Sequence, residues 1–194
     1  MINKQYVSDN QIKDVLTYIA GLKHSKMIRM MMFCSLNGMR SINFRCLQVK
    51  DVFNHDGSVK NVIDLGSDKN KGKFSAQYYV NKQFKKELEA YYEYLKTKHG
   101  EKLTPDTYLF TSQKLNKPFN RVSICRIFHN VYKKFDIEGA SHLGRHLFIT
   151  KMINNGINPF LVKKLVNHRN IQTTQRYYNS NPLQLLNAVE TAKY

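Results

Sequence analysis

Apolar residues recur at helical spacing over most of the chain and predict a mainly α-helical protein. Ser8 begins a Ser-x-x-Gln capping pattern ahead of apolar residues at 12, 15, 16 and 19. Residues 25–37 are apolar on nearly every side, which is typical of a buried central helix that Gly38 would end. Two further amphipathic helices are predicted from Phe84, Leu88, Tyr91, Tyr92 and Leu95, and within 119–135 from one face with Val122, Cys125, Phe128, Tyr132 and Phe135.

A short stretch in the middle of the chain has the pattern of a small antiparallel sheet. Residues 61–66 (NVIDLG) and 74–80 (FSAQYYV) read as strands, and the Lys-rich turn SDKNKGK joins them. Residues 104–110 (TPDTYLF) predict a loop and a short strand. No Gly/Ser/Pro-rich linker divides the chain, so the expected fold class is mainly α with a small antiparallel β-sheet, in one α+β domain.

Capping residues divide the last third into short helices. Ser141 is expected to cap a helix that ends at the left-handed turn of Asn155 and Gly156. Asn158 and Pro159 are expected to begin a helix ending near Val166. A further helix is predicted over 173–178, and a short tail helix has a small apolar face of Leu183, Leu186 and Val189.

The charge balance indicates an anionic partner. The 194 residues include 31 Lys+Arg and 14 Asp+Glu, a formal net charge of +17. Apolar residues (42%) and aromatic residues (12%) are too frequent for a disordered basic tail. An excess of this size favours binding to nucleic acid or to an anionic membrane face. Residues 139–189 contain no Asp or Glu at all.

Cysteine spacing and hydropathy exclude other classes. Cys34, Cys46 and Cys125 form no CxxC pair, which fits reduced thiols rather than a disulfide framework or a zinc finger. The most apolar run, 27–36, contains Arg29 and is too short to span a bilayer. The N-terminus has no apolar signal core. We therefore expect a cytoplasmic protein without a membrane partner, and the excess of Lys over Arg suggests a bacterial or phage gene.

The motif SHLGRH places polar groups at the start of a predicted helix. His142 and Arg145 are spaced i, i+3 and therefore share a face of the helix. A helix N-terminus that presents an imidazole and a guanidinium group is well suited to bind phosphate. Each residue taken alone is more often an ordinary solvated one. The i, i+4 spacing of His142 and His146 is also that of zinc ligands. However, HLGRH lacks the Glu of the zinc-protease pattern and has Arg in the middle, so we expect no metal.

Residues in three other parts of the chain stand out. Arg40 follows the most buried helix, where a charge must leave the core or meet an anion. His168 follows another helix end, and Tyr177 lies nine residues later beside Tyr178. The hairpin turn contributes Lys69, Lys71 and Lys73. Singly, a surface Arg, packed tyrosines and a solvated lysine turn explain them.

In this order the residues resemble the tyrosine recombinase (phage-type integrase) family, whose pattern is Arg … Lys … His-x-x-Arg … His … Tyr. The matching segments are NGMRSIN, the lysine turn, HLGRH and VKKLVNHRNIQTTQRYY. The resemblance extends over about residues 8–185, nearly the whole chain.

The resemblance implies a role for each matching residue. Arg40 and Arg145 would bind the nonbridging oxygens of the scissile phosphate. Lys69, with Lys71 as its rival, would protonate the departing 5′ oxygen. Tyr177 would be the nucleophile. His142 would serve in proton transfer and orientation, His168 would support the phosphate, and weaker DNA contacts would come from Lys71, Lys73, His146, Arg169 and Arg176.

The implied function is site-specific DNA recombination on a mobile element, by integration, excision or inversion, through a covalent 3′-phosphotyrosine. Paired guanidinium groups stabilise the phosphoryl charge without a metal, and the covalent ester makes ATP unnecessary, so no cofactor is expected. Two alternatives stay open: a non-catalytic DNA-binding protein of the same fold, and a relaxing enzyme like the type IB topoisomerases.

The resemblance also implies partners and domain limits. Double-stranded DNA at specific sites would bind a dimer, and two dimers would form a tetramer in synapsis. Accessory DNA-bending proteins are further candidate partners. Residues 1–181 would be the catalytic domain. Residues 182–194 would be a tail helix that docks on a neighbouring protomer or on its own domain. A separate N-terminal DNA-clamping domain is not expected, so the chain is either a minimal recombinase or an isolated catalytic domain.

The chain departs from the family pattern in three motifs. Asn43 stands where the family usually has an acidic residue, and Gly144 replaces a packing leucine in His-x-Leu-Arg. The usual Leu-Gly-His becomes Val166, Asn167 and His168. None of these changes removes a group to which the resemblance assigns catalysis.

Overall fold

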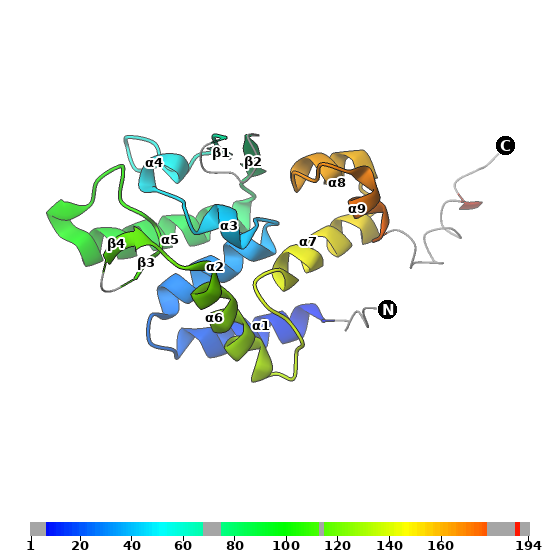
Figure 1. Cartoon of the computed structure of the whole chain (residues 1–194), viewed down its shortest axis with the longest axis horizontal. Helices are drawn as coiled ribbons and strands as arrows, with labels where there is room; N and C mark the ends of the chain where they lie inside the picture. Colours follow the sequence, from blue (N-terminus) through cyan, green and yellow to red (C-terminus); the bar gives the residue numbers. More distant parts are fainter. Residues whose placement is uncertain (1–6, 68–74, 113–114, 178–188, 191–194) are drawn as a thin grey trace.

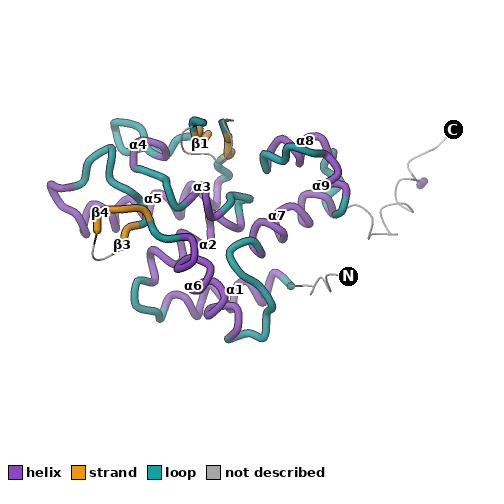
Figure 2. Tube along the Cα trace, viewed as in Figure 1, coloured by secondary structure: helices purple, strands orange, loops and turns teal. Residues whose placement is uncertain are grey.

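The computed structural model describes residues 7–67, 75–112, 115–177 and 189–190. Helices make up most of this part of the chain, and strands are confined to two small antiparallel pairs (Figure 2). The prediction of a mainly α fold with a small antiparallel sheet is confirmed. In the described part of the chain, no helix combines the length and the hydrophobicity needed to cross a membrane.

Helix α2 (Ser25–Leu36) lies at the centre of the fold. It packs against α1 (Asp9–Ala20), α5 (Lys82–His99) and α7 (Leu143–Asn154). Its side chains from Met30 to Ser35 are all buried, as the apolar sequence predicts. The chain leaves α2 through Gly38 in the left-handed conformation, with φ at 82°.

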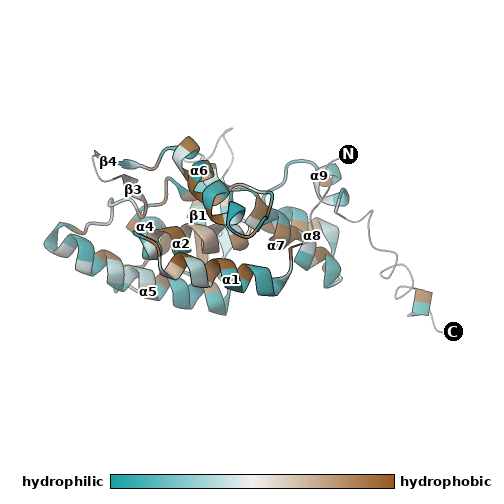
Figure 3. Ribbon diagram, turned by 90° about the horizontal axis from the view of Figure 1, so that it is seen from below, coloured by the Kyte–Doolittle hydropathy of each residue, from teal (hydrophilic) through white to brown (hydrophobic). Residues whose placement is uncertain are grey.

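The flanking helices follow their sequence patterns closely. Ser8 and Gln11 form the predicted capping box at α1, where the Gln11 amide donates to Ser8 Oγ. In α5 the predicted residues Phe84, Leu88, Tyr91 and Leu95 are buried. Hydrophilic and hydrophobic residues alternate along α1 and α5, as expected for helices with one face on the core (Figure 3).

The predicted face of α6 (Arg121–Lys133) is partly wrong. Val122 is 73% exposed, and the face that packs on the core consists of Ile124, Phe128, Val131 and Tyr132. These four residues follow i, i+4, i+7 and i+8 spacing, whereas Val122 lies in the first turn, outside this stripe.

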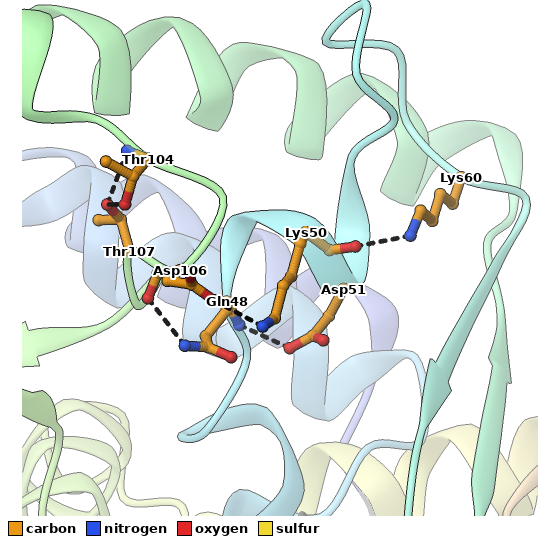
Figure 4. Close-up of polar contacts among 7 residues, drawn as sticks. All are labelled: Gln48, Lys50, Asp51, Lys60, Thr104, Asp106 and Thr107. Atoms are coloured by element: carbon orange, nitrogen blue, oxygen red, sulfur yellow. Dashed lines mark hydrogen bonds and ion pairs between the residues drawn. The ribbon is translucent and has the colours of Figure 1, made fainter.

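Two one-turn helices, α3 (Ser41–Phe44) and α4 (Val49–Val52), come after Gly38. They are too short for hydrophobic periodicity to predict them. Polar contacts fix the segment of α4 to the loop that follows α5 and the short 3-10 helix η1 (Gly100–Lys102). Gln48 Nε2 donates to the Asp106 carbonyl at 2.8 Å, and Lys50 Nζ lies 2.5 Å from the Asp106 carboxylate (Figure 4).

The two strand pairs are each a single hairpin. β1 (Val62–Leu65) and β2 (Ala76–Tyr79) are antiparallel, with Val62 opposite Tyr79. The predicted Lys-rich turn between them, with Lys69, Lys71 and Lys73, falls in 68–74, outside the described residues. The strand expected within 104–110 begins later: β3 (Thr111–Ser112) pairs with β4 (Leu115–Pro118). Tyr108 forms an isolated bridge with Gln48.

Helices α7, α8 (Pro159–Leu165) and α9 (Ile171–Gln175) lie together at one end of the molecule (Figure 1). Helix α7, helix α8 and the residue after α8 form a small core of Ile149, Ile153, Val162 and Val166, and Tyr177, which follows α9, packs against it. As predicted, Gly156 is left-handed, with φ at 75°. The expected cap of α8 is also confirmed, because the Asn158 side chain accepts from the Phe160 amide.

Two predictions about helix ends in this region are wrong. Ser141 does not cap α7: His142 occupies the cap position, and the buried Ser141 hydroxyl instead donates to Ser41 Oγ at 3.2 Å. The helix expected over 173–178 begins at Ile171 because Asn170 caps it, and it ends at Gln175. Tyr177 therefore lies in the turn that follows α9.

Helices α2 and α7 approach each other at Gly144. A Cβ atom at this position would lie 2.7 Å from Ser35 Oγ and 3.0 Å from the Leu36 amide nitrogen. No larger side chain fits without a shift of the helices. The departure from the family's leucine therefore has a packing reason in this chain.

Candidate active site

Arg145 is a buried cation near the start of α7. Its side chain is 4% exposed, and its guanidinium donates to the carbonyl oxygens of Gly38 and Val166, the latter at 2.5 Å. Gly38 is tightly enclosed there, because a Cβ atom would lie 2.9 Å from Phe148 Cδ1. Burial, followed by the positive charge of Arg40, lowers the pKa of Arg145 to about 10. The guanidinium remains protonated at neutral pH.

Arg40 is the second cation of the site. It is half-buried, it comes two residues after Gly38, and its Nη2 donates to the Asn167 carbonyl at 3.0 Å. Among the described residues no carboxylate forms an ion pair with Arg40 or Arg145. Two neighbouring guanidinium groups that main-chain carbonyls hold, with no carboxylate paired to them in the described residues, keep their charge available for binding an anion.

The turn between α8 and α9 supplies the acceptors for both arginines. Asn167 has a left-handed backbone, with φ at 54°, and its neighbour His168 is half-buried. His168 Nδ1 lies 2.9 Å from Thr174 Oγ1, a contact that orients the ring. Burial, and then the charges of Arg145, Arg40 and His146, lower the pKa of His168 to about 4. His168 is therefore neutral at pH 7 when no DNA is present.

His142 occupies the N-cap position of α7 and is exposed at the surface. Partial loss of hydration, and then the charges of Arg121, Arg145 and Arg40, lower its pKa. The ring thus lies in the field of both site arginines. That His142 and Arg145 act at the same site stays a prediction.

Tyr177 is half-buried against the small core, in the turn after α9. Its Oη lies 2.5 Å from Nδ1 of His146, with the ring centroids 5.5 Å apart and the rings tilted by 38°. Burial raises the pKa of the Tyr177 phenol, and the charge of Arg145 opposes that rise. Tyr177 is therefore protonated at neutral pH in the absence of DNA.

The contact between His146 and Tyr177 was not anticipated from the sequence, which predicted His146 only as a weaker DNA contact. Nothing in the local sequence signals it, because the contact depends on how α9 folds back on α7. Of the other weaker DNA candidates, Arg169 and Arg176 are exposed, while Lys71 and Lys73, like Lys69, fall outside the described residues.

Tyr78 is a further residue of the site that sequence reasoning missed. It lies on β2 and is 2% exposed. Within the part of the chain that the structure describes, its hydroxyl has no hydrogen-bond partner of good geometry. Burial raises the pKa of Tyr78, while the charges of Arg145 and Arg40 lower it, so the phenol lies in the electrostatic field of both cations. Tyr78 is one of the alternate residues of β2 that point into the core. A tyrosine in such a position is usually only a packing residue, so its place in the sequence offers no reason to assign it to the site.

The described residues include no group of three or more His, Cys, Asp or Glu side chains that could hold a metal ion. The groups described above at this site are two guanidinium groups, three imidazoles and two phenols, contributed by α2–α3, β2, α7 and the turns around α9. Such a set of groups can bind an anion through its cations while a phenol oxygen attacks that anion.

Solved structures with a similar fold include two recombinases, XerA and XerH. The XerA recombinase superposes with a TM-score of 0.75 at 22% identity, covering 97% of this chain and 66% of XerA. The XerH site-specific recombinase bound to its difH substrate gives 0.70 at 18% identity, covering 95% of this chain and 52% of XerH. At these identities the likenesses show the fold, which this chain shares with the XerA and XerH structures.

The chain belongs to the phage integrase family, whose model matches residues 5–184. Transposase A of transposon Tn554 from Staphylococcus aureus is 28% identical over 162 residues, which cover 80% of this chain and 43% of that protein. The tyrosine recombinase XerC of Lactobacillus leichmannii is 31% identical over 111 residues, covering 55% of this chain and 37% of XerC. The chain thus spans less than half the length of these curated relatives.

Proposed function

We propose that this protein is a site-specific DNA recombinase that cuts and rejoins DNA through a covalent 3′-phosphotyrosine. The observation that carries the proposal is the pair of guanidinium groups of Arg40 and Arg145, bound to main-chain carbonyls and without a carboxylate ion pair in the described residues. Tyr177 lies close enough to this pair for the charge of Arg145 to act on its phenol. A phosphodiester supplies the missing negative charge.

The arginines act on the phosphate oxygens. Attack on phosphorus builds negative charge on the nonbridging oxygens, and cations already held in place stabilise it without reorganising. Each guanidinium is planar and can donate two parallel hydrogen bonds, so Arg40 and Arg145 together orient the phosphate as well as neutralise it. His168, neutral and oriented by Thr174, supplies a further hydrogen bond to the phosphate.

Tyr177 provides the nucleophile. Its Oη forms a bond to phosphorus, the bond from phosphorus to O5′ breaks, and the phenol proton leaves to a base. His146 Nδ1, 2.5 Å from Oη, is placed to accept that proton, and His142 assists proton transfer. The departing O5′ takes a proton from Lys69, or from its rival Lys71, as the family resemblance implies. The reverse steps rejoin the DNA, because the phosphotyrosine ester retains the phosphodiester bond energy.

DNA is the partner that this chemistry requires, and +17 net charge favours it. The XerH and Tn1549 integrase structures were solved with DNA bound, as difH substrate and as circular intermediate DNA respectively. For this chain we propose a dimer on each site, a tetramer in synapsis and, where site architecture needs them, accessory bending proteins. Residues 1–181 form the catalytic domain in this proposal, and 182–194 dock on a neighbouring protomer.

A selection for covalent adducts tests the proposal without knowledge of the target site. The protein is incubated with nicked DNA duplexes that have a randomised central region, and protein-linked DNA is recovered by phenol partition and sequenced. The wild-type protein is expected to form SDS-resistant adducts whose sequences converge on an inverted repeat. Tyr177→Phe, which removes only the nucleophilic oxygen, should abolish them, and Tyr178→Phe is the matched control that should retain them.

The same experiment distinguishes the alternatives. A non-catalytic DNA-binding protein would shift the duplexes in a native gel but would yield no adduct with any variant. An enzyme like the type IB topoisomerases would relax supercoiled plasmid as a monomer without an inverted repeat. Adducts that persist in Tyr177→Phe would contradict the assignment of the nucleophile.

A further inference from the structure

The turn between α8 and α9 accepts hydrogen bonds from both arginines. The side chain of Asn167 in the same turn also bonds to strand β2. Asn167 occupies a left-handed position, with φ at 54°, where the family pattern has glycine. Asn tolerates this conformation better than most residues with a side chain, so the backbone of the turn is preserved. Unlike glycine, Asn167 adds an amide group at this point in the site.

That amide pairs with the main chain of β2. Asn167 Nδ2 donates to the Gln77 carbonyl at 2.9 Å, and the Gln77 amide donates to Asn167 Oδ1 at 3.3 Å. The two bonds pair both the N–H and the C=O of Gln77 with Asn167. A neighbouring strand would pair with Gln77 in the same way. In the two-stranded sheet of β1 and β2, Gln77 lies opposite Asp64, and its main-chain groups turn away from β1 towards Asn167. The side chain of Asn167 thus occupies the free edge of β2.

The main chain of the same turn holds the cations. The Asn167 carbonyl accepts from Arg40 Nη2 at 3.0 Å, and the preceding carbonyl of Val166 accepts from Arg145 Nη2 at 2.5 Å. Tyr78, the next residue of β2, lies in the electrostatic field of both guanidinium groups. Displacement of β2 relative to this turn would therefore change the surroundings of the arginine pair, even though the arginines keep their own bonds.

We propose that Asn167 is a positioning residue for the recombination reaction: it holds the β1–β2 hairpin in register with the arginine pair. The inference rests on the proposed function. The hairpin includes, in sequence, the lysines to which the family resemblance assigns protonation of O5′. Asn167 thus connects the arginine pair, which binds the phosphate in the proposed reaction, to the hairpin whose lysines would protonate the leaving O5′.

Asn167→Gly isolates this role. Glycine keeps the left-handed backbone and the carbonyl that binds Arg40, and it removes only the two bonds to Gln77. We expect the rate of adduct formation at saturating protein to fall by about ten- to a hundredfold, the loss that follows when reacting groups are misplaced by about 1 Å. Affinity for the selected duplex should change less than twofold. His24→Gly is the matched control, because His24 is exposed, lies before α2 and also has a positive φ, at 65°.

A second variant tests the same link from the other strand. Gln77→Pro removes the N–H that donates to Asn167 Oδ1, and proline is tolerated at a strand edge where that N–H does not pair with β1. It also removes the bond from Gln77 Nε2 to Asp64 Oδ2, so its rate is compared with that of Gln77→Ala, which loses only this side-chain bond. If the link is the cause, the double variant should be no slower than Asn167→Gly alone, since both changes break one connection. Additive losses in the double variant would overturn the proposal.

The decisive measurement uses a duplex with sulfur in place of the bridging O5′ at the scissile position. When Tyr177 Oη bonds to phosphorus and the P–S bond breaks, the thiolate leaves without a proton, because a thiol has a pKa of about 8.5. We expect Asn167→Gly to cleave this duplex within about threefold of wild type. Equal slowing on the oxygen and sulfur duplexes, or an unchanged rate on oxygen, would overturn the positioning role. Failure of the proposed function would be distinguishable, because the wild-type protein would then form no adduct on either duplex.

Discussion

The two parts of the molecule are held together in different ways. The part from α1 to α6 has a continuous apolar core in which aromatic rings pack on each other, with the rings of Phe44 and Phe128 stacked at 6.3 Å. The part from α7 to α9 buries a much smaller cluster around Ile149, Ile153 and Val162. The larger part therefore supplies most of the hydrophobic stabilisation.

The smaller part carries most of the site and depends on directed hydrogen bonds. Arg145 bonds to Gly38 of the larger part, Asn167 bonds to Gln77 on β2, and Ser35 Oγ donates to the Ser141 carbonyl at 3.0 Å. Hydrogen bonds fix distance and direction, whereas apolar contacts mainly supply free energy. The comparison shows that this chain separates the region that stabilises the fold from the region that sets the geometry of the site.

Truncation of an aromatic residue in the large core should have the largest effect on stability. Phe128→Ala is expected to lower the free energy of unfolding by about 3–5 kcal/mol, because the lost contacts leave a cavity. Val162→Ala, in the small core, should cost about 2 kcal/mol. Urea unfolding measures both values.

Amide hydrogen exchange measures whether the two parts unfold independently of each other. Val162→Ala should increase exchange of the α8 and α9 amides while those of α2 stay protected, since the small cluster contributes little to the rest. Equal loss of protection throughout the chain would show that the two parts form one cooperative unit, and the comparison would fail.

Acidification should weaken the smaller part through His168. The pKa of His168 is about 4 in the folded protein and near 6.5 when unfolded, so the unfolded state binds the proton first. Its contribution to stability is present above pH 6.5 and is lost as the pH falls towards 4. His168→Asn keeps a polar side chain but cannot titrate. The difference in unfolding free energy between the two proteins should therefore change over this range, and a constant difference would contradict the effect.

A single methyl group should disturb the junction between the two parts. Gly144→Ala places a Cβ atom 2.7 Å from Ser35 Oγ, and we expect a loss of about 1–3 kcal/mol in thermal or urea unfolding. Gly21→Ala is the control: φ is −85° there, and the nearest atom, the Tyr18 carbonyl oxygen, lies at 3.7 Å. It should be neutral or slightly stabilising. If both substitutions were neutral, α2 and α7 would have room to separate.

Local sequence patterns predicted those features that depend on neighbouring residues. The helix start at Ser8, the left-handed turn at Gly156 and the cap at Asn158 follow from side chains that bond to nearby main chain. The prediction failed at Ser141, which has the right residue type for a cap. Its hydroxyl bonds to Ser41, a partner 100 residues away that no local pattern reveals.

The sequence by itself determined the helical character of this protein, its positive charge, and the order of Arg40, His142, Arg145, His168 and Tyr177 along the chain. Only the tertiary structure decided that Arg145 is buried against two carbonyls, that His146 contacts Tyr177, and that Asn167 connects to Gln77. The first set rests on periodicity and residue type, which are local. The second rests on directional contacts between segments that are distant in sequence and meet only when the helices pack.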